Sequence, residues 1–362
     1  MPTRPRVAIV HDYLTQRGGA ERVVLAMARA FPDATIYTSL YEPASTFEEF
    51  ENHRVVTSVL NHVAALRARH RLGLPAYPIY FGNLTVDADV VVASSSAFAH
   101  EVRSTGKVLV YCHNPARFLY QGSDYHRDRG RLTQLLATAA LWPMRSLVRR
   151  AARRADLVLC NARVVRERIA EHWGVDAELL PPPPAITAEG PVERVPGVAE
   201  GGALLVTRLM AHKRVDLALE GARRAGVPAV VVGSGPDEEQ LRHAFPEATF
   251  LGAVRDEQLR WLYANADLHL TASHEDFGLT PLEAAAFGTP TVAPNEGGFL
   301  DTVVEGVTGT FFTPGDVGSL ARALRDAQST HFDATAITAH AQAFGEERFA
   351  ARLAALVDEL AR

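Results

Sequence analysis

The chain has 362 residues, of which 47% are hydrophobic and 22% charged, and its formal net charge is −5. This length suits two domains of ordinary size, and the composition excludes disordered and fibrous classes. No apolar run approaches the roughly eighteen residues of a membrane-spanning helix. An acidic chain whose basic residues lack interleaved aromatics is also a poor candidate for nucleic-acid binding.

The N-terminus leads directly into a strand-like segment at 7–10, without the apolar region and cleavage site of a signal peptide. Cys112 and Cys160 lie far apart in the sequence and between apolar residues, which favours two buried thiols over a disulfide. We therefore expect a cytoplasmic protein.

The charge is unevenly distributed along the chain. Residues 1–183 hold 23 Arg and Lys against 17 Asp and Glu, a net of +6, and the remainder holds 14 against 25, a net of −11. Two basic runs lie in the first part: Arg67, Arg69 and Arg71, and then Arg149, Arg150, Arg153 and Arg154. Such runs indicate either a solvated helix face or a surface attracted to anionic lipid or an anionic acceptor.

Short apolar runs alternate with helix-like patterns. In the first half, strands are predicted at 7–10, 35–37, 90–93, 108–111 and 157–160, with helices such as 20–30 and 163–173 between them. The strands are apolar throughout rather than alternating, which indicates burial on both faces and hence a parallel sheet flanked by helices.

A four-proline run at 181–184 interrupts this pattern and predicts a stiff connector. Strands are predicted again at 203–207, 229–232, 249–251, 268–271, 291–293 and 309–312, and a helix over 346–362. We therefore predict an α/β protein with two doubly wound, Rossmann-like domains, 1–183 and 184–345, that face one cleft, followed by the helix.

Ligands of open parallel sheets bind at the carboxyl ends of the strands. Thr280, Pro281 and Glu283 follow the strand at 268–271 and have the spacing of a capping box, which predicts a helix whose N-terminus attracts phosphate. Gly278 permits a close approach of a ligand to the backbone. Glu275 precedes this helix and is expected to point into the cleft, whereas Glu283 could equally be only a helix cap.

Arg208 and Lys213 follow the strand at 203–207. Lys213 is one of two lysines, the other being Lys107, beside thirty-five arginines. A fixed Arg and Lys can meet the charge that grows on a departing diphosphate and so replace a divalent metal. The alternative is ordinary surface charge.

Weaker signals follow three other strands. Gly18-Gly19 opens a helix and can approach a phosphate, and Gly233-Ser234-Gly235 follows the strand at 229–232, but neither has the spacing of the dinucleotide fingerprint. His113 follows the strand at 108–111 and is a candidate ligand contact, although a lone histidine is more often structural.

No cluster of His, Cys or carboxylates has the spacing of metal ligands. Asp87 and Asp89 precede the strand at 90–93, so they lie at the wrong end of it for the cleft, and we interpret them as loop residues. No metal or other cofactor is expected.

Together these segments resemble glycosyltransferase family 4, a large group of retaining enzymes with the GT-B fold. The resemblance covers most of the chain and is strongest over 203–316. One departure is Asp301, which stands where glutamate is commoner. The motifs that carry the resemblance are Arg208 with Lys213, Glu275 and Glu283 separated by seven residues, Gly18-Gly19-Ala20-Glu21, and the later Gly297-Gly298, Gly306, Gly309 and Pro314-Gly315-Asp316.

The resemblance implies a role for each residue. Arg208 and Lys213 would hold the diphosphate of a nucleotide-sugar donor, and Glu283 would bind the ribose hydroxyls. The first domain would hold the acceptor, with the last helix crossing back onto it. The remaining donor contacts would be Glu275 and the backbone of Phe277, Gly278 and Leu279 at the sugar, Thr280 near the phosphate, the backbone of Val254 at the base, His113 at the far side of the sugar, and the loop of Gly18 and Gly19.

The segment from Tyr111 to Phe118, with Asp12-Tyr13-Leu14, is similar to bacterial mannosyltransferases that build surface polysaccharide. This similarity favours GDP-mannose as donor, a lipid-linked or oligosaccharide acceptor, and peripheral contact of the basic first domain with the anionic inner face of the cytoplasmic membrane. A UDP-sugar donor stays open. So do a sugar-nucleotide epimerase of the same architecture, which would need acid/base carboxylates in the cleft, and a non-catalytic subunit that binds a sugar nucleotide.

Overall fold

The computed structural model describes residues 5–120 and 131–362. The chain divides into two compact units: Met1–Pro182 together with Glu346–Arg362, and Pro183–Gly345. The chain therefore leaves the first unit within the proline run and returns to it at the last helix.

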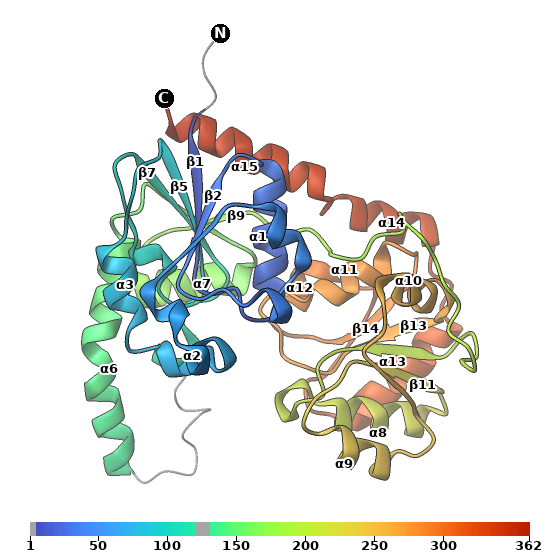
Figure 1. The fold of residues 1–362 in the computed structure, drawn as a ribbon. Coiled ribbons are helices and arrows are strands. Elements are labelled where there is room, and N and C mark those ends of the chain that lie inside the picture. The colour runs from blue at the N-terminus through green and yellow to red at the C-terminus, as the bar shows by residue number, and fades with distance from the viewer. Residues whose placement is uncertain (1–4, 121–130) are drawn as a thin grey trace. The chain divides into compact units, whose positions relative to one another are not determined.

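A parallel sheet forms the centre of the first unit (Figure 1). Its seven described strands have the order β3-β2-β1-β5-β7-β8-β9. The apolar pattern predicts five of them but misses the short outer strands β3 and β9, whose residues are only partly buried or are exposed. The bounds are β1 Val7–His11, β2 Thr35–Thr38, β3 Val55–Thr57, β5 Val90–Ser95, β7 Lys107–Cys112, β8 Leu157–Cys160 and β9 Glu178–Leu179, with β4 Thr85–Val86 and β6 Arg103–Ser104 forming a separate pair.

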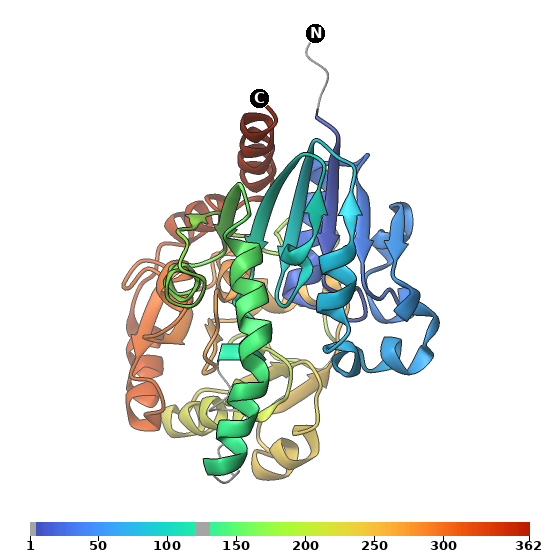
Figure 2. The ribbon, with the colours of Figure 1, turned by 90° about the vertical axis from the view of Figure 1, so that its left-hand side faces the viewer.

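Helices connect these strands, as parallel crossovers require. The longest described helix, α6, extends beyond the ends of the strands (Figure 2). The α-helices are α1 Gly19–Ala30, α2 Ala64–Ala68, α3 Tyr77–Asn83, α4 Arg117–Tyr120, α6 Arg131–Ala152, α7 Arg163–Trp173 and α15 Glu346–Leu360. The 3-10 turns are η1 Pro43–Ser45, η2 Glu48–Asn52, η3 Val59–His62, η4 His70–Gly73 and η5 Ala99–Glu101.

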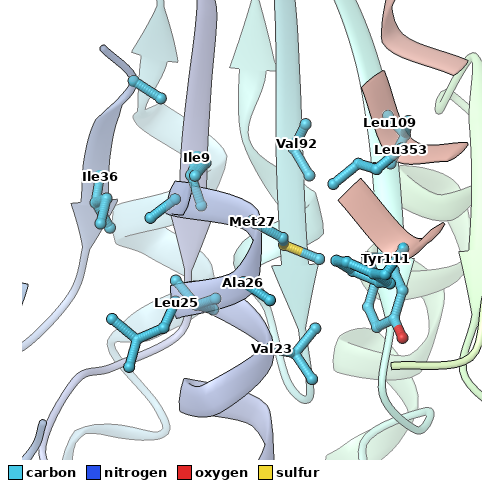
Figure 3. Close-up of a cluster of buried hydrophobic side chains, with 14 of the residues drawn as sticks. Ile9, Val23, Leu25, Ala26, Met27, Ile36, Val92, Leu109, Tyr111 and Leu353 are labelled. Atoms are coloured by element: carbon cyan, nitrogen blue, oxygen red, sulfur yellow. The ribbon is translucent and has the colours of Figure 1, made fainter. Parts of the chain in front are cut away.

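The C-terminal helix belongs to the core of the first unit. Figure 3 shows Met27 of α1 in one buried cluster with Val92 of β5, Tyr111 of β7 and Leu353 of α15. Burying each such side chain stabilises the fold by about 1.5–3 kcal/mol. An ion pair between Arg29 and Glu346 joins α1 to the start of α15.

Cys112 and Cys160 are register partners on the neighbouring strands β7 and β8. Both are buried thiols, so that prediction is confirmed even though the fold brings the two residues side by side. The Cys160 thiol lies 3.6 Å from the carbonyl oxygen of Glu178, to which it can donate.

The second unit has a parallel sheet of six described strands in the order β12-β11-β10-β13-β14-β15. Counted within the unit this is the order 3-2-1-4-5-6 of the doubly wound nucleotide-binding fold. All six strands are predicted by the sequence pattern. Their bounds are β10 Ala203–Val206, β11 Ala229–Val232, β12 Thr249–Gly252, β13 Leu268–Leu270, β14 Thr291–Pro294 and β15 Gly309–Phe312.

Helices cover both faces of this sheet. Leu205 points to a cluster with α8 and α13, and its neighbour Leu204 points to a second cluster with α10 and α11, which is why the strands are apolar without alternation. The elements are η6 Ala211–Lys213, α8 Val215–Ala225, α9 Glu238–Ala244, α10 Asp256–Asn265, α11 Leu279–Ala285, α12 Phe299–Thr302, α13 Val317–Ser329 and α14 Ala334–Gln342.

Each sheet has one point at which the direction of winding reverses. It lies between β1 and β5 in the first unit and between β10 and β13 in the second. The loops that leave such neighbouring strands turn in opposite directions and open a crevice, where doubly wound folds bind their ligands.

Candidate active site

Lys213 and Glu275 meet at the reversal point of the second unit. Lys213 comes from the loop after β10 and Glu275 from the loop after β13. Lys213 Nζ lies 2.5 Å from Glu275 Oε1, and the two side chains are 13% and 26% exposed. Ser273 Oγ donates to the same carboxylate oxygen at 2.8 Å. The ion pair is thus held in place and still reachable from solvent.

The loop that carries Lys213 is strained. Arg214, directly after it, has φ +50° and is the one non-glycine residue with positive φ in the described ranges 5–120 and 131–362. Such a conformation costs on the order of 1–3 kcal/mol and is found preferentially at functional sites. It turns the chain from η6 into α8 and leaves Lys213 at the crevice.

Gly233 and Gly235 pack against this loop. A Cβ on Gly233 would lie 1.9 Å from the carbonyl oxygen of Thr207, and one on Gly235 would lie 2.1 Å from that of Leu209. Leu209 N–H donates to the carbonyl of the intervening Ser234 at 3.0 Å. The structure therefore gives these glycines a packing role.

Gly297 and Gly298 support the loop of Glu275 in the same way. Gly298 N–H donates to the carbonyl of Glu275 at 2.9 Å. A Cβ on Gly297 would lie 2.5 Å from that oxygen, and one on Gly298 would lie 2.2 Å from Phe277 Cα. Only glycine permits two backbones to approach so closely.

The predicted capping box at Thr280 and Glu283 is wrong. Helix α11 begins at Leu279, after Gly278, whose φ of +84° makes it the cap residue, and no side chain caps this end. The buried Glu283 carboxylate instead accepts a hydrogen bond from Tyr263 OH at 2.9 Å and one from Ala185 N–H at 3.4 Å. It is therefore more than a helix cap.

The other residues of the second unit that are predicted to contact the donor differ in exposure. Arg208 is exposed, and no described residue pairs with its guanidinium, which leaves its donors open to a ligand. Phe277 is buried, whereas Val254, Leu279 and Thr280 are half-buried. Their predicted contacts with a donor stay predictions.

His113 belongs to the first unit and lies at its reversal point. Ser94, at the end of β5, has His11 of β1 on one side and His113 on the other. His113 Nε2 is 2.8 Å from Ser94 Oγ. His11 Nδ1 is 3.1 Å from the Ser94 carbonyl oxygen and 3.0 Å from its Oγ.

The contacts of Ser94 favour one position for the hydrogen on each ring. A carbonyl oxygen only accepts, so His11 Nδ1 carries a hydrogen, and the Ser94 hydroxyl is then free to donate to His113 Nε2. Burial, together with the nearby His11, lowers the pKa of His113 to about 3, so its ring is neutral. When the Ser94 hydroxyl donates in this way, neutral His113 carries its one hydrogen on Nδ1, from which it can donate to a ligand.

Glu21 lies next to His11. Burial acts to lower the pKa of His11, but the side chain of Glu21 and the charges of Glu21 and Asp12 outweigh it, and the net shift is upward. Gly18 leaves room for the Glu21 carboxylate, because a Cβ there would lie 2.4 Å from Glu21 Oε2. Gly19 begins α1. The glycine pair thus accommodates a buried acid, and its predicted contact with a donor stays a prediction.

Asp12 has a structural role that the sequence motifs leave unassigned. Its buried carboxylate accepts four backbone hydrogen bonds, from the N–H groups of residues 96 to 99, at 2.6–2.9 Å. These bonds join the loop after β1 to the loop after β5. They hold the strand ends that carry His11 and Ser94.

The basic run at 149–154 makes contacts within the first unit. The Nε atoms of Arg149 in α6 and of Arg153 just after it both donate to the carbonyl of Trp173, at 3.3 and 3.2 Å, where they stabilise the C-terminus of α7. Arg154 donates to the carbonyl of Glu101 at 3.4 Å. This run is therefore largely structural.

Other candidate sites have structural partners. Asp87 and Asp89 both accept hydrogen bonds from Arg6. Lys107, the second lysine, lies 2.9 Å from Asp156. In the part of the chain that the structure describes, no helix has the length and apolar character needed to cross a bilayer.

Two doubly wound units in one chain define a GT-B fold, and solved structures agree. HepE of Anabaena, crystallised in complex with UDP-glucose, aligns with a TM-score of 0.69 over 98% of this chain and 100% of its own, at 21% identity. At that identity the likeness concerns the fold.

The sequence places the chain in a family within that fold. Residues 17–183 match the family described as Glycosyltransferase Family 4, and residues 200–342 match Glycosyl transferases group 1. Together the two matches cover most of the chain, which belongs to the group 1 glycosyltransferases of family 4, as its motifs predict.

Curated relatives include mannosyltransferases and a glycogen synthase. A GDP-mannose-dependent alpha-mannosyltransferase of Corynebacterium glutamicum is 37% identical over 105 residues, 29% of this chain and 25% of the relative. Glycogen synthase of Mycobacterium tuberculosis is 38% identical over 36% of this chain and 35% of its own. Alpha-1,3/1,6-mannosyltransferase ALG2 of Dictyostelium discoideum is 25% identical over 85% and 86%. The chain thus spans only about a quarter to a third of the length of the first two relatives.

Proposed function

We propose that this protein is a retaining glycosyltransferase that moves a hexose from a nucleotide diphosphate donor to an acceptor hydroxyl without a protein-bound metal. The observation that carries the proposal is the Lys213–Glu275 ion pair at the reversal point of the second sheet. Lysine has three N–H donors, so after one binds Glu275 the other two can reach phosphate oxygens. Arg208 adds a second cation with its donors open.

The reaction breaks the bond between the anomeric carbon and the phosphate oxygen, and its electron pair leaves with the diphosphate. Lys213 and Arg208 stabilise the charge that grows there, in a site where fixed donors need no reorganisation. The acceptor oxygen bonds to the anomeric carbon on the same face, and its proton passes to the leaving phosphate. Glu275 acts as the group that positions Lys213 and contacts the sugar, rather than as a covalent nucleophile. His113 donates its Nδ1 hydrogen to a sugar hydroxyl.

We propose mannose from GDP-mannose as the donor, and a lipid-linked or oligosaccharide acceptor on the cytoplasmic side of the membrane. The support is the similarity of the segment from Tyr111 to Phe118 to mannosyltransferases, and two curated relatives with mannosyl names. The UDP-glucose complex of the Anabaena structure and the glycogen synthases keep a glucosyl donor as the alternative.

Thermal-shift measurements with GDP, UDP and ADP test the nucleotide. A ligand at a hundred times its dissociation constant stabilises the fold by about 2.7 kcal/mol. We expect the largest rise in Tm with GDP, and a larger rise with UDP would replace GDP-mannose by a UDP-sugar.

Incubation with the donor and no acceptor tests the reaction class. Slow release of free sugar is the expected result, and it should persist in EDTA. Interconversion of the donor would instead identify an epimerase, and neither reaction a binding subunit. Loss of turnover in EDTA would refute the metal-free mechanism.

A further inference from the structure

The segment 59–73 exposes an unusual set of side chains. It consists of η3, α2 and η4, which pack against one another. Val59 is 81% exposed, Val63 48% and Leu72 59%. From Asn52 to Val86 the chain has no Asp or Glu. The exposed residues of 59–73 are only apolar or basic: Val59, His62, Val63, Ala64, Ala65, Ala68, Arg69, Arg71 and Leu72.

The opposite side of this segment is fixed to the first unit. Arg67 Nε donates to Glu42 at 2.8 Å. The His70 ring stacks on Tyr13 with centroids 4.1 Å apart, and its backbone carbonyl accepts from Tyr77 OH at 2.5 Å. Of the basic run at 67–71, then, one arginine turns inward and pairs, while Arg69 and Arg71 stay on the exposed side.

Exposed apolar side chains of this size, rimmed by polar residues, mark an interaction surface. The segment itself carries arginines and aliphatic residues and no acid, and the neighbouring Glu42 is paired with Arg67. Such a combination is complementary to the boundary between anionic headgroups and acyl chains.

We propose that the exposed face of 59–73 docks the protein on an anionic phospholipid bilayer. Val59, Val63 and Leu72 enter the headgroup region, while Arg69 and Arg71 bind the lipid phosphates. The inference deepens the proposed function, because it states where a lipid-linked acceptor is met. The stacking of His70 on Tyr13 connects this face to the loop after β1.

Co-sedimentation of the full chain with phospholipid vesicles tests the proposal. The vesicles are phosphatidylcholine with and without about one third phosphatidylglycerol. The wild-type protein should bind the anionic vesicles, and less so as salt is added. Arg69→Gln with Arg71→Gln should lower the partition coefficient on the order of tenfold or more. Val59→Ser with Leu72→Ser should lower it by on the order of tenfold.

The matched controls are Arg150→Gln, an exposed arginine of α6, and Val192→Ser, a valine of the second unit that is 56% exposed. Both should bind like the wild type. Equal binding to neutral vesicles, no binding of the wild type, or unchanged binding of both double variants would overturn the proposal. A dimer in sedimentation velocity that Val59→Ser with Leu72→Ser dissociates would assign the face to a second copy instead.

Donor hydrolysis in solution separates this inference from the proposed function. The surface variants should hydrolyse the donor at the wild-type rate and melt at the wild-type temperature. If the wild type bound vesicles but turned over no donor, the proposed function would fail and the docking face would stand.

Discussion

Lys213 Nζ lies 2.5 Å from Glu275 Oε1, across the one point of the second sheet where its winding reverses. The two residues are far apart in the chain and come from loops that turn in opposite directions. Each loop is held by a pair of glycines from a neighbouring strand end, Gly233 with Gly235 and Gly297 with Gly298. The pair is therefore positioned by the backbone around it, and its chemistry can be tested separately from folding.

Replacing Lys213 by Ala should lower kcat/KM for the donor about 100-fold or more, because one fixed donor to a developing charge is worth roughly 3 kcal/mol. Tm should change little, since the Glu275 carboxylate is still partly hydrated and keeps its bond from Ser273. Lys107→Ala is the matched control, because it removes the other lysine from an exposed pair with Asp156. Equal activity of the Lys213 and Lys107 variants would refute the assignment of Lys213.

Replacing Ser94 by Ala should change the tautomer of His113. Without the hydroxyl, Nε2 loses the donor that keeps the ring hydrogen on Nδ1, so a mixture of tautomers is expected. The ¹⁵N chemical shifts of the His113 ring in the free protein report this directly, whatever the donor sugar is.

Ser95→Ala is the control for that measurement. Ser95 Oγ lies 2.7 Å from His100 Nδ1 and belongs to a different histidine. We expect it to leave the His113 shifts in place. A wild-type spectrum with the hydrogen on Nε2 would contradict the tautomer derived from the Ser94 contacts.

How much the sequence predicts depends on how local each feature is. Unbroken apolar runs identify every strand of the second sheet, because burial on both faces leaves a signal within each strand. Lys213 and Glu275 are also found, because each directly follows such a strand. Ser94 is missed because nothing around it is a motif. Only the order β1-β5-β7 places it between His11 and His113.

The capping box fails for a related reason. The spacing of Thr280 and Glu283 fits a local pattern, but the left-handed Gly278 starts the helix earlier than the pattern expects. Glu283 is then two residues further into the helix than the pattern expects, where Tyr263 of α10 reaches its carboxylate. A contact between two helices leaves no signal in the sequence pattern of either helix alone.

Replacing Gly298 by Ala should destabilise the second unit by about 2–3 kcal/mol, because overpacked backbone must move. Gly298 has φ −70°, so the cost is steric and arises from the 2.2 Å approach to Phe277 Cα. The displaced loop should also lower turnover. Urea unfolding measures the first effect and donor hydrolysis the second.

Gly306→Ala provides the comparison. Gly306 has φ +73°, and a Cβ added there would meet nothing within 4 Å, so alanine at this position costs only the left-handed strain of about 1 kcal/mol. Turnover should be unaffected. A Gly298 variant that is no less stable than the Gly306 variant would show that the glycine loop yields easily and does not hold Glu275.

Acid should unfold the second unit partly through His269. This residue is fully buried in β13, with Nδ1 3.2 Å from Thr291 Oγ1, and burial lowers its pKa to about 3. The ordinary value is 6.5, so between these limits the unfolded chain binds a proton that the folded protein does not. Stability is then fully present above pH 6.5 and is lost as the pH falls toward 3, by up to about 1.4 kcal/mol per pH unit.

His269→Gln, which keeps a polar partner for Thr291 but does not titrate, should flatten that slope in urea unfolding measured from pH 7 to pH 4. His243→Gln, at an exposed position, controls for the loss of a histidine and should leave the slope as in the wild type. Equal slopes in all three proteins would mean that His269 is already protonated in the folded state.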